Sequence, residues 1–325
     1  MLRVVEVVDA LRRTFARVPA RVKLPLAPRA RLVQVRAPMA PGRFQEFQHR
    51  ALQGLVHRIS RLRRDSVVVR GHTMPYLTAG SGPPVVLLHG FADQKETWSL
   101  VGRILSAQHR IIAPDLPGFG AADRIRPEEA GTAALADYLA GFLEALDLAP
   151  AHVVGNSMGG GVAQRLATGW PERVRTLSLV CSMGPPLPKS QFTVHREERG
   201  GNVLVPETVE EYMAMLEWVF ERKPPFPGVV LRHMARRQVE RAAEFRAYFQ
   251  TLEDEWDWEH VERATQPTLV VQGRRDRVIH PAMARGLADA LPDSQLVMLA
   301  GTGHAPQWEK PAETARILRV FFAAH

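Results

Sequence analysis

A serine inside a run of glycines is the feature that most constrains this chain. Residues 153–161 read Val-Val-Gly-Asn-Ser-Met-Gly-Gly-Gly, so a short apolar strand leads into the pattern Gly-x-Ser-x-Gly. Gly155 and Gly159 allow a strand and a helix to approach closely around a strained turn. Such a turn places the Ser157 hydroxyl at a helix N-terminus, where free backbone N–H groups favour negative charge. The pattern predicts a nucleophilic serine; the alternative is a serine that only caps the helix.

The composition is that of a chain with a large apolar core. It has 325 residues, of which 46% are hydrophobic, and this length suits one or two domains. The single cysteine, Cys181, lies in the apolar run 177–181, so we expect a buried side chain and no internal disulfide. No metal-type spacing of cysteine and histidine occurs, and we expect neither a metal nor an organic cofactor. We also expect no membrane-spanning helix and no secretory signal.

The positive charge is concentrated in the N-terminal part of the sequence. The chain carries 42 Lys and Arg against 34 Asp and Glu, a net charge of +8. Residues 1–65 hold 15 of these cations and 4 of the acids, which leaves the remaining residues slightly acidic. Proteins that bind nucleic acid carry a basic patch on the domain that makes the contact. The body of this chain therefore gives no reason to expect a nucleic-acid partner.

Residues 1–65 are expected to form a basic, amphipathic, helical extension. Apolar residues recur at helical spacing in 1–18 and in 43–64, and five prolines between them prevent one continuous helix. Two interpretations stay open. The extension packs on its own body or on another subunit of a homo-oligomer, or its apolar faces enter a lipid surface while arginines meet anionic head groups. An organelle transit peptide is disfavoured because no serine precedes Ser60. We expect a cytoplasmic protein, with peripheral membrane contact under the second interpretation.

The body alternates between strand and helix patterns. Its strands are short apolar runs of the kind that is buried on both faces of a sheet. Alternation with helices implies an α/β fold, with a mostly parallel central sheet and helices on both faces. The strands are expected at 66–70, 76–79, 85–88, 111–113, 153–154, 177–180, 268–271 and 295–299. The helices are expected at 99–106, 133–146, 281–291 and 312–322.

Residues 184–263 interrupt this alternation. The segment opens with three prolines, shows no strong strand pattern and is too long to be a simple loop. We interpret it as a helical cap, inserted over the carboxyl edge of the sheet between the core segments 66–183 and 264–325. Its helices are expected at 209–220, 229–238 and 241–252.

Two further residues complete a catalytic constellation. A serine hydroxyl needs a general base, and the base needs a carboxylate to orient it. Behind a serine turn of this type the expected chain order is acid and then histidine. Asp276 and His304 stand in this order beside glycine turns at the ends of two late strands, where open α/β sheets bind ligands. The alternatives are an aspartate paired with a neighbouring arginine and a histidine that caps a helix.

A serine that attacks a carbonyl also needs donors for the oxyanion of the tetrahedral intermediate. The backbone N–H after the nucleophile belongs to Met158, and the loop after strand 85–88 nominates Phe91. His89 is expected to orient this loop by hydrogen bonds rather than to act as a base. Asp115 is expected to brace a neighbouring turn.

The motifs resemble those of the α/β-hydrolase superfamily over roughly residues 66–325. Two stretches, 89–98 and 205–212, are similar to the family V bacterial lipases and to the membrane-associated monoacylglycerol lipases. The superfamily motifs are 89–91 (His-Gly-Phe), 115–120 (Asp-Leu-Pro-Gly-Phe-Gly), 155–160 (Gly-Asn-Ser-Met-Gly-Gly), 273–276 (Gly-Arg-Arg-Asp) and 303–304 (Gly-His).

The resemblance implies a serine hydrolase that cleaves carboxylic esters with an acyl chain, among them monoacylglycerols and medium-chain esters. It implies a nucleophile at Ser157, an acid at Asp276 and a base at His304, with oxyanion donors at Phe91 and Met158. Two alternatives remain: a carbon–carbon bond hydrolase of the meta-cleavage-product type, and a non-catalytic binding protein that keeps the fold. The apolar cap residues either line a substrate pocket or only pack against the core: Met213, Met215, Leu216, Trp218, Val219 and Phe220.

Overall fold

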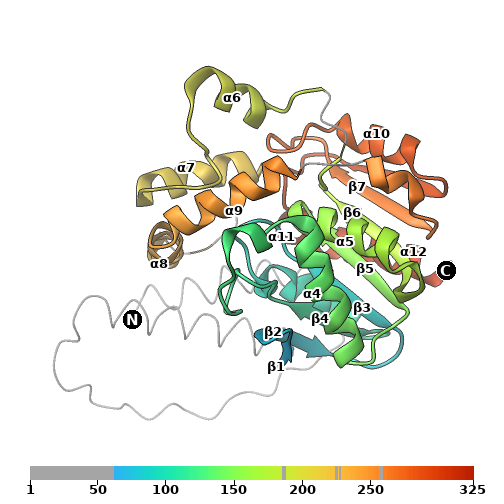
Figure 1. Cartoon of the computed structure of the whole chain (residues 1–325). Helices are drawn as coiled ribbons and strands as arrows, with labels where there is room; N and C mark the ends of the chain where they lie inside the picture. Colours follow the sequence, from blue (N-terminus) through green and yellow to red (C-terminus); the bar gives the residue numbers. More distant parts are fainter. Residues whose placement is uncertain (1–61, 185–187, 224–225, 227, 256–258) are drawn as a thin grey trace, which may run out of the picture.

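The computed structural model describes most of the chain beyond the N-terminal extension. The described residues are 62–184, 188–223, 226, 228–255 and 259–325. The predicted amphipathic helix at 1–18 and residues 43–61 of the one predicted at 43–64 lie outside these ranges (Figure 1). The last two residues of the second prediction, 63–64, form part of a strand instead of a helix. In the described part of the chain, none of the helices combines the length and the apolar character needed to cross a membrane.

A single eight-stranded sheet forms the centre of the molecule (Figure 1). The spatial order is β1-β2-β4-β3-β5-β6-β7-β8; the pairs β1–β2 and β2–β4 are antiparallel and all others are parallel. The sheet is therefore mostly parallel, which confirms the predicted fold class. The strands are β1 (Arg63–Val69), β2 (His72–Ala79), β3 (Pro84–Leu88), β4 (Arg110–Pro114), β5 (Ala151–Asn156), β6 (Val174–Val180), β7 (Thr268–Gly273) and β8 (Ser294–Leu299).

The first strand begins earlier than the sequence pattern indicated. Residues 63–65, which we had assigned to the extension, pair with β2 through Arg63 opposite Thr78. Leu62 is 2% exposed and packs in the core. The apolar pattern did not reach these residues because β1 is an edge strand, and backbone pairing with one neighbour tolerates polar, exposed side chains. The sheet therefore starts at Arg63 rather than at Ser66.

Helices cover both faces of the sheet, as the alternation of patterns predicts. On one face α3 (Ser99–Leu105) packs beside α12 (Pro311–Ala323). On the other face lie α4 (Thr132–Ala145), α5 (Met158–Gly169) and α10 (Met283–Ala290). The strands between these layers are buried on both faces: every side chain from Val85 to Leu88 has no exposed surface. The parallel strands thus form the hydrophobic core that fixes the positions of the loops at their carboxyl ends.

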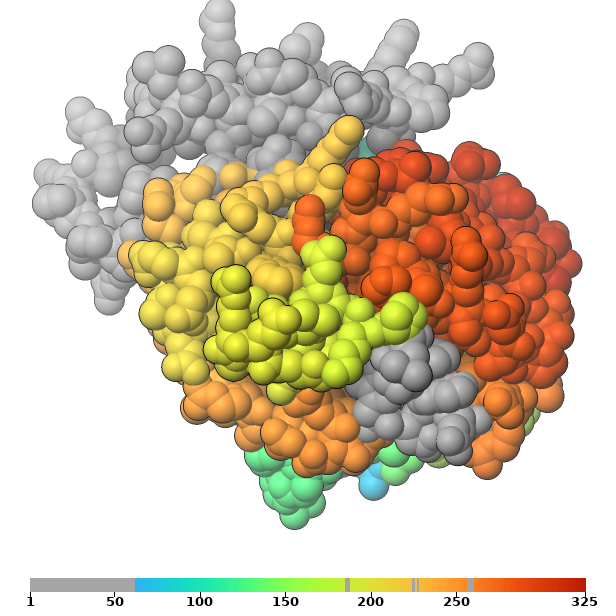
Figure 2. Space-filling view, turned by 90° about the horizontal axis from the view of Figure 1, so that it is seen from above, coloured from blue at the N-terminus to red at the C-terminus, as the bar shows by residue number. Residues whose placement is uncertain are grey.

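Between β6 and β7 the described residues form four α-helices, here called the cap helices, and a short 3-10 helix, Glu259–Arg263. Three match the expected positions, and α6 was not predicted because it buries only Phe192 and shows no helical hydrophobic spacing. Viewed from above, α6 lies across the cap between the yellow residues of α7 and the orange-red C-terminal core (Figure 2). The cap helices are α6 (Gln191–Arg199), α7 (Val209–Val219), α8 (Gly228–Val239) and α9 (Ala242–Asp254).

Candidate active site

Ser157 occupies a strained turn between β5 and α5. Its backbone has φ 55° and ψ −119°, a region that non-glycine residues rarely adopt. The turn is held because the Ser157 N–H donates to the carbonyl of Val180, at the end of the neighbouring strand β6. A Cβ on Gly155 would come within 2.1 Å of the Gly159 carbonyl oxygen, and one on Gly159 within 2.5 Å of the His89 carbonyl oxygen. Glycine is therefore required at both positions, as the sequence pattern predicts.

His304 and Asp276 meet at the ends of β8 and β7. The His304 Nδ1 atom lies 2.8 Å from Asp276 Oδ2, and both residues are at most 6% exposed. The other carboxylate oxygen, Oδ1, accepts from the backbone N–H groups of Val278 and Ile279, each at 2.9 Å. Asp276 Oδ2 also accepts from the side-chain amide of Gln272 at 3.0 Å. Four donors thus fix the carboxylate. Because His304 turns its Nδ1 edge toward Asp276, its Nε2 edge is left for a substrate.

The loop that carries His304 is tied to the cap by a glutamate that the sequence analysis missed. Glu309 accepts hydrogen bonds from the backbone N–H groups of Gly303, Glu221 and Arg222. The His304 N–H donates to the carbonyl of Val219, at the end of α7. Burial raises the pKa of Glu309, and these backbone donors oppose the shift. No local pattern marks Glu309, because two of its three partners, Glu221 and Arg222, lie more than 80 residues away in the sequence.

The loop after β3 is held in place by His89. The backbone N–H of Leu116 donates to His89 Nε2 at 3.0 Å, so Nε2 is the acceptor and Nδ1 carries the proton. Nδ1–H then donates to the Gly90 carbonyl at 2.8 Å. Across a trans peptide the N–H points opposite to the C=O, so the Phe91 N–H is directed away from His89. His89 is therefore an orienting residue, as expected.

A buried ion pair braces the same loop. Asp115 is fully buried, accepts from the Lys95 backbone N–H at 2.7 Å and pairs with the Lys95 ammonium group. It also accepts from the Ala121 N–H at 2.8 Å, across the glycine turn. Asp115 thus connects the loop after β3 to the loop after β4, and the predicted bracing role is confirmed.

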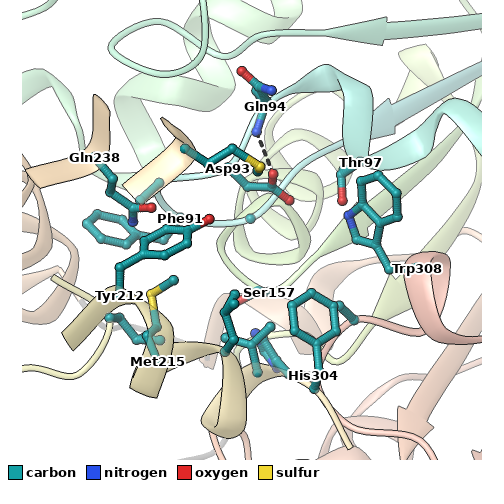
Figure 3. Close-up of a pocket in the computed structure, with 18 of the residues that line it drawn as sticks. Phe91, Asp93, Gln94, Thr97, Ser157, Tyr212, Met215, Gln238, His304 and Trp308 are labelled. Atoms are coloured by element: carbon teal, nitrogen blue, oxygen red, sulfur yellow. Dashed lines mark hydrogen bonds between the residues drawn. The ribbon is translucent and has the colours of Figure 1, made fainter. Parts of the chain in front are cut away.

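Three of the five predicted site residues line one cavity of about 220 Å³ beneath the cap helices (Figure 3). Ser157, His304 and Phe91 line it, and Ser157 and His304 lie on the same side of it in the close-up. Met158 is buried as the first residue of α5, where its N–H has no partner within the helix. Asp276 stands behind His304 and does not line the cavity.

The cap supplies much of the apolar lining, but not with all of the residues proposed. Met215, Leu216, Val219 and Phe220 line the cavity. Met213 does not: it packs within the cap's own apolar cluster. Trp218 is also outside the cavity and packs against His195, with ring centroids 5.0 Å apart and the ring planes tilted by 57°. Both alternatives for the cap residues therefore apply, each to different side chains. The additional apolar lining residues from the cap are Leu204, Tyr212, Phe226, Leu231, Met234 and Phe245.

Three residues of metal-ligand type, Cys181, Asp276 and His304, bring one ligand atom each within 4.8 Å of one another. Their polar atoms already engage protein partners, because Asp276 and His304 bond to each other and the Cys181 thiol donates to the carbonyl of Gly303. Burial raises the pKa of Cys181 well above its usual value, so the thiol stays protonated, whereas metals bind the thiolate. We assign no metal to this cluster.

Comparison with known proteins gives the same fold and a consistent set of relatives. Residues 85–317 match the model of the Alpha/beta hydrolase family. Lipase 1 of Psychrobacter immobilis is 31% identical over 77% of this chain and 81% of its own length. Monoacylglycerol lipase ABHD6 of Rattus norvegicus is 28% identical over 75% of this chain and 77% of its own. The crystal structure of a membrane phospholipase A, described as a bacterial virulence factor, matches with a TM-score of 0.82 at 30% identity, covering 86% of this chain and 92% of that one.

The family match spans most of the described residues, from β3 to the final helix α12. Its relatives include bacterial lipases and monoacylglycerol lipases at about 30% identity, in agreement with the resemblance of the sequence motifs. The chain belongs to the alpha/beta hydrolase family.

Proposed function

We propose that this protein is a serine hydrolase that cleaves carboxylic esters of lipid type. Ser157 Oγ attacks the ester carbonyl while His304 accepts its proton, and Asp276 stabilises the imidazolium that forms. The backbone N–H groups of Phe91 and Met158 receive the oxyanion of the tetrahedral intermediate. His304 then protonates the leaving alcohol, and water hydrolyses the acyl-enzyme by the reverse sequence.

The observation that carries this proposal is the pairing of His304 Nδ1 with Asp276 Oδ2 at the edge of the cavity that Ser157 lines. It supports the proposal because the aspartate fixes the ring with Nε2 unprotonated and free to act as a base. The strained backbone of Ser157 supports it further, since such strain persists where the surrounding structure enforces it, often at functional sites.

The proposed substrates are esters with an acyl chain, including monoacylglycerols and medium-chain esters. The apolar lining from the cap suits an acyl chain, because burying methylene groups there is favourable by about 0.8 kcal/mol each. The relatives point to the same class of substrates by their names, lipase, monoacylglycerol lipase and phospholipase A.

The proposal is tested by a hydrolysis series of p-nitrophenyl esters with short to long acyl chains, run beside monoacylglycerols. We expect turnover with a maximum at medium or long chains. A dienone substrate of the meta-cleavage type is the matched comparison for the carbon–carbon alternative. Turnover of the dienone without turnover of any ester would overturn the ester proposal. If Ser157 reacts with a fluorophosphonate but no ester is cleaved, the ester proposal is replaced by a different acyl-transfer reaction. If Ser157 does not react, the ester proposal is replaced by the non-catalytic alternative.

We further propose that the protein is cytoplasmic and that residues 1–65 bring it to an anionic lipid surface. The motivation is the 15 Lys and Arg among these residues, set beside apolar positions at helical spacing. In the full chain, changing Arg12, Arg13 and Arg17 to Gln should weaken sedimentation with vesicles containing phosphatidylserine, while binding to neutral vesicles stays low for both proteins. Equal binding of the variant and the wild type to the anionic vesicles would contradict this proposal.

A further inference from the structure

The carboxyl group of Asp93 faces the cavity from the wall opposite the apolar cap. Asp93 lies two residues after Phe91, in the loop that carries the proposed oxyanion donor, and it lines the cavity (Figure 3). Its Oδ1 accepts from the backbone N–H of Gln94 at 2.8 Å, which fixes the orientation of the carboxyl group. Nothing in the proposed ester cleavage uses this group, because the acid that serves His304 is Asp276.

The hydroxyl of Tyr212 faces the same part of the cavity from the cap. Tyr212 is 4% exposed, lies on α7 and directs its hydroxyl toward Asp93 across the cavity (Figure 3). Burial raises the pKa of Tyr212, with a smaller contribution from the Asp93 charge, so the hydroxyl stays protonated and can donate. Among the described residues, no protein group accepts this hydrogen bond.

Gln307 lines the cavity and carries a buried amide oxygen that has no partner among the described residues. The Asn156 amide nitrogen donates to the carbonyls of Val180 and His304, so the Asn156 oxygen must be the acceptor toward Gln307. The Gln307 amide nitrogen therefore donates to Asn156 Oδ1 and to Thr97 Oγ1. Gln307 Oε1 is buried and has no partner in the described structure. The hydrogen-bond network thus determines which end of the Gln307 amide is the oxygen and which is the nitrogen.

These groups form a polar part of the cavity, whereas much of the lining from the cap is apolar. Burial raises the pKa of the Asp93 carboxyl, while the nearby His89 and hydrogen bonds from Gln94 and Thr97 oppose the shift. A buried polar group without a partner is costly, whereas one that meets a ligand hydroxyl recovers its hydrogen bond. An acyl chain offers no such hydrogen bonds, but the alcohol half of a polyol ester does.

We propose that Asp93 and Tyr212, with Gln307 beside them, form a subsite that recognises free hydroxyl groups on the alcohol half of the ester. The inference rests on the proposed function and deepens it: esters of a polyol such as glycerol, with unesterified hydroxyls, are preferred over esters of simple alkyl alcohols. The apolar part of the cap lining takes the acyl chain, and the part of the cavity between Asp93 and Tyr212 takes the alcohol. Asp93 is thus a specificity-determining residue of the proposed reaction.

The test compares two esters with the same carbon skeleton, monohexanoylglycerol and propyl hexanoate, which differ only in the free hydroxyls. The wild type should show a higher kcat/KM for the glycerol ester. In Asp93→Leu and Tyr212→Phe this preference should fall about tenfold for each hydrogen bond lost, with the propyl ester hydrolysed at nearly the wild-type rate. Asp93→Asn keeps a polar group and should retain part of the preference. Asp289→Asn, an exposed carboxylate on α10, is the control and should retain all of it.

Three kinetic results would overturn the subsite. One is a wild-type enzyme without preference between the two esters. Another is a preference that survives in Asp93→Leu. The third is an equal loss on both esters in Asp93→Leu, which would assign Asp93 a role in shaping the loop instead.

A binding measurement separates this inference from the proposed function. Ser157→Ala is titrated calorimetrically with glyceryl hexyl ether and with propyl hexyl ether, neither of which can be hydrolysed. Tighter binding of the glyceryl ether, lost in Ser157→Ala/Asp93→Leu, supports the subsite even if the wild type cleaves no ester, in which case only the proposed reaction fails. Equal binding of the two ethers, or binding of neither, overturns the subsite whatever the hydrolysis assay shows.

Discussion

Nδ1 of His304 lies 2.8 Å from Oδ2 of Asp276, although the two residues are 28 positions apart in the sequence. The two parallel strands β7 and β8 end side by side, and each continues into a glycine-containing turn that carries one of these residues. A third parallel strand, β5, ends at Asn156, directly before Ser157, on the same edge of the sheet. The strand order therefore brings Ser157, Asp276 and His304 to one edge of the sheet. Most of our predictions concern the contacts that keep these residues in position.

Changing Asp276 to Asn should reduce kcat by about a hundredfold to ten-thousandfold, with little change in KM. Two backbone N–H groups hold the oxygen at the Oδ1 position, so the amide nitrogen faces His304 Nδ1 and donates to it. The imidazole then carries its proton on Nε2 and cannot act as the base, and the charge that stabilises its protonated form is lost. Steady-state kinetics on a soluble ester measure this effect, with thermal unfolding as the check on folding. An Asp276→Asn protein with wild-type kcat would mean that another acid serves His304.

Gly155→Ala should abolish activity and lower stability markedly. The new Cβ would lie 2.1 Å from the Gly159 carbonyl oxygen, so the turn that carries Ser157 would have to open. Gly169→Ala is the matched control, because a Cβ there meets no atom within 4 Å. It lies at the end of the same helix, α5, and should leave activity unchanged. Similar activity losses in the two variants would show that the close approach of Gly155 to Gly159 is not the cause of the loss.

Lys95→Met should destabilise the fold by about 3–5 kcal/mol, because it leaves the Asp115 charge buried without its partner. Lys95 is 5% exposed and Asp115 is fully buried, so water cannot replace the lost ion pair. The comparison is Lys189→Met, which breaks a pair with Glu197 whose two side chains are about half exposed. That change should cost at most about 1 kcal/mol. Urea unfolding of both variants measures the difference; equal values would argue against the bracing role of Asp115.

Stability should fall as the pH drops from 6.5 toward 4. Burial lowers the pKa of His152 to about 4, helped by the nearby charges of His109, Arg175 and His325. Between these pH values the unfolded chain binds a proton that the folded protein refuses, so protonation favours unfolding. The resulting decrease in the free energy of unfolding reaches about 3 kcal/mol below pH 4.

His152→Phe is the variant that tests this pH dependence. The replacement keeps an aromatic ring against Phe322, whose centroid lies 4.4 Å from the His152 ring, and removes the titrating group. Its free energy of unfolding should depend less on pH between 4 and 6.5 than that of the wild type. An identical pH dependence in both proteins would assign the titration to other groups.

The features predicted correctly from the sequence are those that depend on a local residue pattern. Apolar runs located all eight strands, and glycine spacing located the turn at Ser157, because both signals act over a few neighbouring residues. The start of β1 was placed too late, since an edge strand with exposed polar residues carries no hydrophobic signal.

Contacts between distant segments escaped the sequence analysis. Glu309 binds three backbone N–H groups on two loops, and Gln307 bonds to Asn156 across 151 positions. Their residue types are common on surfaces, so only the folded structure distinguishes them. The same holds for Asp93 and Tyr212, whose convergence on one cavity depends on how α7 lies over the loop after β3.

The most direct measurement is the turnover of monohexanoylglycerol by the wild type and by Ser157→Ala, with both proteins shown to be folded by thermal unfolding. The account predicts clear turnover by the wild type and a kcat at least about a thousandfold lower in the variant, since nucleophile and base act as a unit. A folded Ser157→Ala protein that hydrolyses the ester at the wild-type rate would contradict it.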